Sequence, residues 1–241
     1  GEYLQFVAGV QNVTYKDDSD PVYPIKDDAA STTGVFIDAR PKLPFSPDTA
    51  LSFAVRHDFL PGSQEETIWK FGARQPLPGG FYVRGNGGTS YSLPRNTELF
   101  VETATTVGNP NLQAEHTKTF NGAVGFQRDF GDVRVALEIG GFKTEITNRI
   151  QGSSDFRIPA TGQFGPRNTY FNNTALTKID GLTADFNLNI GRAWRVNLGY
   201  TAQDAYLDSG PLAKEQINET PAWFVTGTLE WTSPDQRFTA A

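Results

Sequence analysis

Residues 181–203 read GLTADFNLNIGRAWRVNLGYTAQ, and this stretch decides the fold. Its first half places apolar residues such as Leu182 and Phe186 at every second position, with Thr, Asp and Asn between them. The second half repeats the alternation with Val196 and Leu198. A period of two is the spacing of side chains on one face of a β-strand. Because a short Gly-containing link joins the two halves, the stretch predicts an antiparallel hairpin.

The same alternation recurs along the chain, at residues 50–59, 118–130 and 222–231. These segments are about ten residues long, which is the length of a tilted strand that crosses a bilayer. The face opposite the apolar one carries Asn, Thr, Gln, Asp and Arg, as a wide water-filled lumen requires. A soluble sandwich also alternates, with its apolar side turned inwards, so the period alone does not separate the two folds.

The sequence predicts about ten strands and the start of an eleventh. They span residues 3–13, 34–43, 49–59, 67–75, 80–90, 117–130, 132–149, 176–190, 194–207 and 221–232, and the last begins near 237. Within 132–149 the apolar phase changes after Gly140 and Gly141. Either a bulge or a strand that rises beyond the bilayer would explain this change.

The links between these strands alternate between tight and long. The tight links are Pro44–Asp48, Gln75–Gly80, Gly131–Asp132, Gly191–Trp194 and Thr232–Gln236. The long links run roughly Lys16–Thr32, Leu60–Glu66, Ser90–His116, Gln151–Leu176 and Asp208–Thr220. Short turns at one end and long loops at the other are typical of a bacterial outer-membrane barrel. Together with the number of strands, this asymmetry favours an antiparallel transmembrane β-barrel over a sandwich.

The amino-acid composition further limits the classes of protein to which the chain can belong. Apolar residues make up 38% of the 241 residues, below the roughly 45–50% of soluble domains, although that benchmark also counts Gly. No apolar run approaches the ~18–20 residues that a membrane helix needs, whereas strands can span without one. A net charge of −6 argues against binding nucleic acid, which needs a basic face. The absence of Cys removes disulfides and thiolate metal sites.

One stretch after the fifth strand carries a family resemblance. The run GNPNLQAE at Gly108–Glu115 resembles the Gly-Asn-Pro-x-Leu-x-Pro-Glu run of TonB-dependent outer-membrane receptors, where a long outer loop re-enters the barrel. Before this run, Lys70–Arg74, Val83–Gly85 and Glu98–Phe100 are similar to the family's preceding hairpin and short loop helix. After it, Asn148–Ile150, Lys178–Asp185 and Leu198–Thr201 resemble the next strands in order, so that the resemblance covers 69–231. Ala114 replaces the usual Pro, and Tyr91–Leu93 replaces the usual aromatic-basic approach to Pro94. Both departures fall in outer loops.

The resemblance implies an all-β fold: about 10–11 strands of a larger barrel of about 22 strands. The chain starts without Met or a signal-peptide pattern and stops as a new strand begins. We therefore expect residues 1–241 to be a partial β-barrel domain, a fragment without the plug domain, the TonB-contacting segment or the last strands.

By the same resemblance, the parent protein is a receptor in the bacterial outer membrane that imports a scarce nutrient with energy supplied through TonB. Its partners would be outer-membrane lipid, TonB and a small-molecule substrate such as an iron-siderophore. The sequence predicts no enzyme activity, no catalytic residues and no cofactor. His57 and His116, the two histidines, lie far apart without a nucleophile motif. A competing hypothesis is a soluble or surface β-sandwich that binds carbohydrate or protein, based on a mean hydropathy of −0.41 and long polar loops. A third hypothesis is a β-barrel without a plug, either a channel or an adhesin.

Two local patterns suggest binding chemistry and have simpler explanations. Gly85–Gly88 could be a phosphate loop, but no helix pattern follows it, so small residues on a crowded strand explain it better. The acidic groups at 17–20 and 27–28 could bind Ca²⁺, but their spacing is not that of an EF-hand, and a solvated outer loop explains them better. We therefore predict no metal site.

Aromatic residues gather at the predicted strand ends, as in the girdles of a membrane barrel: Phe59, Phe130, Trp194, Trp223 and Trp231. The resemblance also implies that substrate meets the outer loops. Loop residues able to grip an anionic or aromatic ligand are Tyr91, Arg95, Arg157, Arg167 and Tyr170. Arg offers a two-pronged donor for carboxylate or catecholate-like oxygens, and Tyr offers a stacking face. The alternative for each is a solvated loop residue.

Overall fold

A computed structural model shows how these segments assemble. It describes residues 3–15, 30–61, 64–103, 105–153, 168–208, 213–214, 216–217, 220–233 and 239–240. Every strand predicted from the alternation is present, with ends shifted by a few residues.

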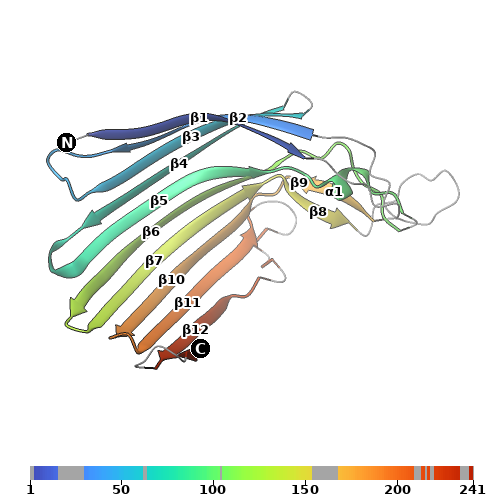
Figure 1. The fold of residues 1–241 in the computed structure, drawn as a ribbon. Coiled ribbons are helices and arrows are strands. Elements are labelled where there is room, and N and C mark those ends of the chain that lie inside the picture. Colours follow the sequence, from blue (N-terminus) through green and yellow to red (C-terminus); the bar gives the residue numbers. More distant parts are fainter. Residues whose placement is uncertain are drawn as a thin grey trace, which may run out of the picture.

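Eleven of the strands form one sheet in which each strand is antiparallel to its neighbours. The strands are β1 (Leu4–Tyr15), β2 (Ala30–Pro41), β3 (Ala50–Leu60), β4 (Gln64–Pro76), β5 (Phe81–Ser92), β6 (Glu115–Phe130), β7 (Val133–Thr147), β10 (Thr177–Ile190), β11 (Trp194–Leu207), β12 (Trp223–Thr232) and β13 (Thr239–Ala240). Their order in the sheet follows the sequence, except that β10 lies next to β7 (Figure 1). The sheet is therefore an up-and-down meander, as a barrel wall requires.

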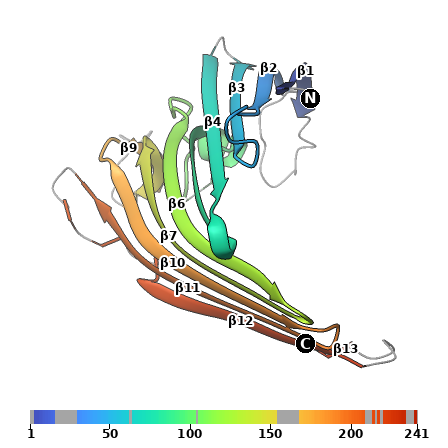
Figure 2. The same ribbon diagram turned by 90° about the vertical axis from the view of Figure 1, so that its left-hand side faces the viewer.

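The sheet is a single curved layer. Figures 1 and 2 show it bending like part of a cylinder wall, with β1 and β12 at opposite sides of an open curve. No second sheet packs on either face in the part of the chain that the structure describes. A sandwich would bury its apolar side chains between two sheets. The open, single-layer sheet is instead the shape of a barrel fragment.

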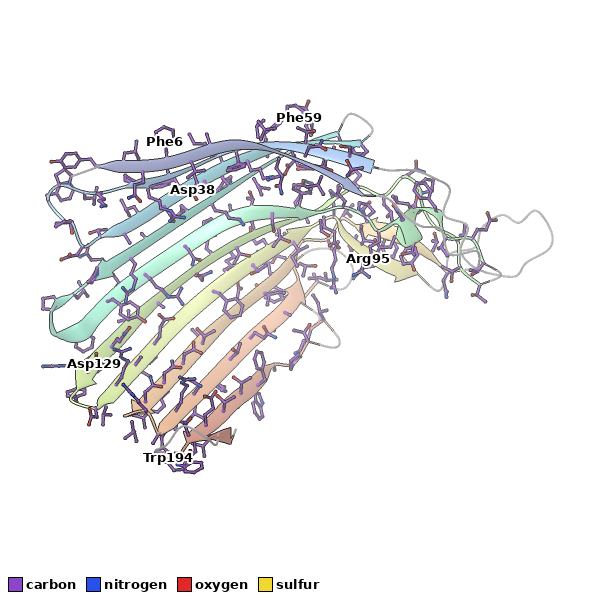
Figure 3. All side chains as sticks on the ribbon, in the orientation of Figure 1. Phe6, Asp38, Phe59, Arg95, Asp129 and Trp194 are labelled. Atoms are coloured by element: carbon purple, nitrogen blue, oxygen red, sulfur yellow. The ribbon has the colours of Figure 1, made fainter. Side chains whose placement is uncertain are left out.

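The two faces of the sheet differ in chemistry. Figure 3 shows Phe6 and Phe59 on the convex face and Asp38 on the concave face. Large apolar side chains of the convex face are well exposed: Leu182 is 64% exposed, Val225 60% and Leu198 49%. Apolar side chains exposed in a continuous layer are stable against lipid rather than water. The convex face is therefore the lipid-facing side, and the polar concave face lines the interior.

The short turns cluster at one end of the sheet. Gly131 and Gly191 start the turns after β6 and β10 with φ of 63° and 55°, a conformation that Gly adopts without strain. At the other end the loops are longer, with one exception. The predicted long link at 60–66 is wrong: β3 ends at Leu60 and β4 begins at Gln64. Both strands extend further than their alternation suggested, because polar residues continue the pairing after the apolar phase stops.

The pairing of β7 shows why the apolar alternation changes phase after Gly140 and Gly141. It pairs residue by residue with β6 and β10 from Val133 onward, so there is no bulge. Past the glycines the convex positions are Lys143 and Glu145, which form an ion pair at 3.1 Å. The convex face thus turns from apolar to charged, as expected where a strand rises out of the bilayer.

The short helix α1 (Asn96–Phe100) and a small hairpin of β8 (Arg149–Ser153) and β9 (Thr169–Asn173) lie at the long-loop end of the sheet (Figure 1). The resemblance implied the helix, whereas the sequence predicted no separate hairpin. In the described residues, no helix is long and apolar enough to cross a membrane.

Candidate functional site

The concave face carries a charged network in the halves of β5 and β7 that lie towards the short turns. The guanidinium of Arg84 donates to both carboxylate oxygens of Glu138, with Nε at 2.9 Å from Oε2. Tyr82 donates its hydroxyl to the same carboxylate at 2.7 Å. Arg74 stacks over the Tyr82 ring, with its Cζ 4.1 Å from the ring centre. A carboxylate so engaged ties β5 to β7 and fixes the orientation of Arg84 and Tyr82.

This network skips β6, which lies between β5 and β7. Glu138 pairs with Gly125 in the sheet, and Tyr82 pairs with Gly125 from the other side. A Cβ at Gly125 would collide with the Tyr82 ring. The glycine therefore opens the path through which the side chains of β5 and β7 meet.

A second network ties β1, β3 and β5 together. Asp58 is 2% exposed and receives Arg56 Nε at 2.7 Å and 2.9 Å on its two oxygens. Arg56 also donates to Gln11 Oε1 at 2.7 Å. Gly34 of β2 lies beneath, where a Cβ would collide with both Arg56 and Asp58. Charged partners compensate the buried carboxylate, so the network stabilises the wall instead of leaving a bare charge.

The ladder between β4 and β5 stops early on the long-loop side. Their pairing ends at Lys70 and Gly88, although β4 begins at Gln64 and β5 continues to Ser92. Figure 2 shows β4 rising away from β6 at this end. Three contacts bridge the opening: Tyr91 Oη to Asp58 Oδ2 at 2.9 Å, His116 Nε2 to Glu66 Oε1 at 2.9 Å, and Trp69 N to Thr89 Oγ1 at 3.2 Å. Side chains thus replace backbone pairing where the hairpins separate.

We name the described structure at the long-loop end the outer platform: α1, residues 101–103 and 105–115 after it, and the strands β8 and β9. Two backbone bonds join its halves, from Val107 N to Asn168 O at 2.9 Å and from Asn168 N to Thr105 O at 2.8 Å. Val101 and Leu112 are buried within it. The platform is therefore an ordered surface over the end of the sheet rather than a set of separate loops.

Amide and carboxylate side chains complete the platform. The Asn172 amide accepts from Gln113 N at 2.8 Å and donates to Gln113 O at 2.9 Å and Asn148 O at 2.8 Å. Asn109 donates to Tyr170 O at 2.9 Å, and Glu115 accepts from Ile150 N. The run at Gly108–Glu115 thus fastens the hairpin to the sheet.

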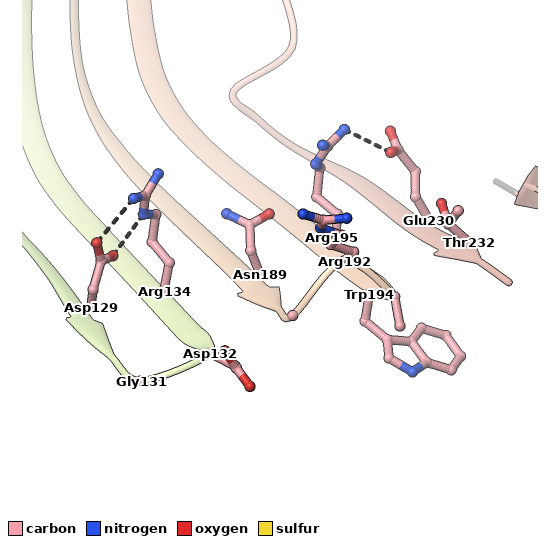
Figure 4. A pocket seen from close by; sticks show the side chains of 12 residues that line it. Asp129, Gly131, Asp132, Arg134, Asn189, Arg192, Trp194, Arg195, Glu230 and Thr232 are labelled. Carbon is pink, nitrogen blue, oxygen red and sulfur yellow. Dashed lines mark hydrogen bonds and ion pairs between the residues drawn. The ribbon is translucent and has the colours of Figure 1, made fainter. Parts of the chain in front are cut away.

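At the short-turn end, charged residues line a hollow of about 510 Å³. Asp129 pairs with Arg134, with Arg134 Nε 2.6 Å from the carboxylate, and Arg195 pairs with Glu230 at 2.9 Å (Figure 4). Trp194 points away from them, and its ring centre lies 6.4 Å from that of Trp231. The pattern of an aromatic convex rim and a charged concave rim matches a membrane boundary at this height.

The structure places the predicted ligand residues in different surroundings. The loop position predicted for Tyr91 is wrong: the residue lies near the end of β5, where its hydroxyl donates to Asp58 across the opening between β4 and β5. Arg95 is exposed at the start of α1 (Figure 3), and its backbone N–H donates to Glu98. Tyr170 is half-buried on β9, which lies against α1. Arg157 and Arg167 lie outside the described residues, so a ligand role for these side chains stays a prediction.

The other sequence patterns resolve as follows. Gly85–Gly88 lies within β5, so the phosphate-loop alternative is wrong; a Cβ at Gly87 would meet the rings of Phe71 and Phe120. The acidic groups at 17–20 and 27–28 lie outside the described residues. His57 stands beside Phe59 at 4.7 Å between ring centres, at the end of β3. Over the described ranges, no three His, Asp or Glu side chains gather in a metal-binding group.

Sequence reasoning missed the concave networks around Glu138 and Asp58. Arg84 and Glu138 are 54 positions apart, and their meeting depends on register across three strands. One signal was available: charged residues at the polar positions of otherwise alternating strands, such as Arg84 and Asp185.

Comparisons with known proteins agree with this geometry. A family model described as "TonB dependent receptor-like, beta-barrel" matches residues 1–241. A search of the curated proteins gave no match.

Solved structures share the fold. The siderophore receptor PirA from Pseudomonas aeruginosa aligns with a TM-score of 0.69 at 15% identity, over 96% of this chain and 46% of that one. The hemophore receptor HasR from Serratia marcescens, solved with its hemophore HasA and heme, aligns with a TM-score of 0.69 at 16% identity, over 98% and 48%. The copper transporter OprC aligns with a TM-score of 0.64 at 12% identity, over 97% and 39%. The chain thus spans less than half the length of these structures.

Proposed function

The chain belongs to the TonB-dependent receptor-like β-barrel family, and from that premise we propose that it is part of the barrel wall of an outer-membrane receptor for active import. The nutrient would be a scarce small molecule such as an iron-siderophore, and the energy would arrive through TonB. The observation that carries the proposal is the single curved sheet with an apolar convex face and a polar, charged concave face. Such a wall separates lipid from an aqueous interior.

In this proposal the domain 1–241 supplies the lipid-facing wall, the polar lumen and an ordered outer platform. A plug domain and a TonB-contacting segment would belong to the whole protein. The relatives named above take a siderophore, heme from a hemophore, and copper, so their fold does not choose among substrates. Selection would fall to the outer platform and the concave charges.

Among the predicted ligand residues, we propose Arg95 and Tyr170 as direct contacts. Arg95 is exposed at the start of α1, and Tyr170 lies on β9 beside that helix. The hydroxyl of Tyr91 is engaged by Asp58, so its role would be to hold β5 in place. Arg157 and Arg167 remain candidates from the sequence.

Uptake by the native host tests the proposal. The gene for the full-length protein is deleted, and uptake of ferric enterobactin, haemin and Cu²⁺ is measured with and without a plasmid copy. We expect loss of uptake for one probe on deletion, recovery with the plasmid, and loss again when an uncoupler removes the proton gradient. Unchanged uptake of all three probes, together with a protein that is a compact soluble particle without detergent, would reject the proposal.

A further inference from the structure

The outer end of β4 is paired through its backbone on one side only. On the β3 side the ladder is continuous from Gln64 to Arg74. On the β5 side the ladder begins at Lys70, so residues 64–69 of β4 have no backbone partner in β5. In the described residues, each bond across the opening between β4 and β5 involves a side chain. The chemistry of these side chains therefore sets how closely the two sides of the opening approach.

One of the three bonds across the opening contains a histidine. Nε2 of His116, on β6, lies 2.9 Å from Oε1 and 3.0 Å from Oε2 of Glu66, on β4. Because a carboxylate only accepts, this ring nitrogen carries a hydrogen. A histidine gains its second ring proton between about pH 8 and about pH 5, and the bond then gains the attraction of two opposite charges. The other two bonds, from a tyrosine hydroxyl and from a backbone amide, do not titrate in this range.

The surroundings of His116 leave Glu66 as its carboxylate partner. The His116 side chain is 45% exposed, so its protonation follows the acidity of the water outside. The other titratable or charged residues at this end lie on β3, β4, β5, β6, β7 and β8: Arg56, Asp58, Glu65, Tyr91, Glu115, Lys118, Glu145 and Arg149. Of the carboxylates, Asp58 is held by an arginine, Glu115 by a backbone N–H and Glu145 by a lysine.

His57, the second histidine of these 241 residues, provides an internal comparison. It also lies beside a glutamate of β4, with Nε2 3.7 Å from Oε2 of Glu65, and its Nδ1 lies 2.8 Å from Oγ1 of Thr67. Here, however, β3 and β4 are joined by an unbroken backbone ladder. Protonation of His57 therefore adds a charge to strands that the backbone already holds together. Protonation of His116 acts where that ladder is missing.

We propose that His116 and Glu66 form a pH-sensitive latch across the outer opening of the wall. In acid, the imidazolium pairs with Glu66 and draws the outer part of β4 towards β6. As the pH rises, the pair loses its positive charge, and β4 separates further, held by the two bonds that do not titrate. Because β5 leads from this opening through Leu93 into α1, the latch also sets the distance between β4 and the start of the outer platform. External acidity would thus control the shape of the wall at its outer end.

Distances between two spin labels in the full-length protein in lipid vesicles test the latch. The labels are attached at Gln64→Cys and Ser92→Cys, two exposed positions at the outer ends of β4 and β5. Electron paramagnetic resonance gives the distribution of distances at about pH 5.5 and about pH 8, on either side of the titration of a histidine. We expect the ratio of the shorter to the longer distances to fall about threefold as the pH rises, as for the loss of one exposed ion pair.

Four variants of the labelled protein assign the response to the latch. His116→Gln keeps a donor without the titration, and Glu66→Gln removes the negative charge, so both should lose the dependence on pH. His116→Lys keeps a positive charge and should hold the shorter distances at both pH values. The matched control His57→Gln should respond as the labelled protein without further substitution does.

Distances that do not change with pH in the labelled protein would overturn the latch. So would a response that persists in His116→Gln, or one that disappears in His57→Gln. Because the distances are measured without substrate or transport, a failure here is distinct from a failure of uptake in the host.

Discussion

The wall of β6, β7, β10 and β11 and the outer platform at its end are held together in different ways. In the wall, continuous backbone ladders pair every residue, and side chains alternate between lipid and lumen. In the platform, single amide side chains such as Asn172 and Asn109 bind the backbone of segments far away in sequence. The wall therefore depends on a repeated pattern, and the platform depends on a few particular residues.

This difference determines how substitutions in each region affect the stability of the protein. A wall position outside the crowded glycines and the concave networks is constrained mainly by its face, because the backbone ladder does not depend on the side chain. A platform position such as Asn172 satisfies three backbone groups at once. We expect a substitution in the wall to change the stability of the barrel through the contact of its side chain with lipid or lumen. We expect a substitution in the platform to change stability only near the substituted residue.

The largest expected effect is a charge on the lipid-facing side of the wall. Leu198→Arg in β11 should destabilise the folded barrel by about 2–4 kcal/mol, because the guanidinium must enter the hydrocarbon. The matched control is Asn197→Arg, one residue away on the concave face, which should cost less than about 1 kcal/mol. Denaturant unfolding of the full-length protein in lipid vesicles measures both. Equal losses for the two variants would break the distinction between the faces.

A smaller and local effect is expected in the platform. Asn172→Ala removes three hydrogen bonds to the backbone and should lower the local stability of β8–β9 by about 1–3 kcal/mol. Hydrogen exchange should speed up in β8 and β9 and stay unchanged in β10 and β11. Asn187→Ala is the control, because Asn187 lies on the concave wall and makes no side-chain hydrogen bond in the described ranges. Faster exchange throughout the sheet would contradict a separate platform.

The smallest expected effect is at the opening between β4 and β5. Tyr91→Phe removes one hydrogen bond to Asp58 and should cost about 1 kcal/mol. Exchange of β5 amides near Ser92 should increase, whereas Tyr200→Phe on the convex face should change nothing there. If Tyr91→Phe also leaves exchange at this end of β5 unaltered, backbone pairing rather than the side-chain bridge holds the opening.

The sequence predicts the wall well because alternation is a local property. The spacing of Leu182 and Phe186 predicts β10 without information about the neighbouring strands, and Gly131 predicts a turn on its own. The hairpin β8–β9 was not predicted because its strands are five residues each and it is held by contacts with Asn109 and Gln113, which lie outside it in the sequence. The link at 60–66 was misjudged because strands that leave the bilayer lose their apolar phase while keeping their pairing.

The side-chain networks on the concave face could not be predicted from the sequence. Arg74, Arg84 and Glu138 come together only through the register of β4 to β7, which one sequence without its pairing does not contain. The resemblance at Gly108–Glu115 located the outer platform, because that run binds the hairpin directly. It did not locate the charge network of the lumen, because Arg84 and Glu138 meet only through the pairing of β5, β6 and β7.

The most direct test of the account is a scan of single cysteines along β11. The chain contains no Cys, so each substitution in 195–203 gives one reporter within this segment. The full-length protein in lipid vesicles is spin-labelled, and the label's collisions with oxygen and with a water-soluble nickel complex are compared. The account predicts a period of two, with Val196, Leu198 and Tyr200 in lipid and Asn197, Gly199 and Thr201 in water. The opposite assignment, or equal access to water at all positions, would contradict a lipid-facing convex wall.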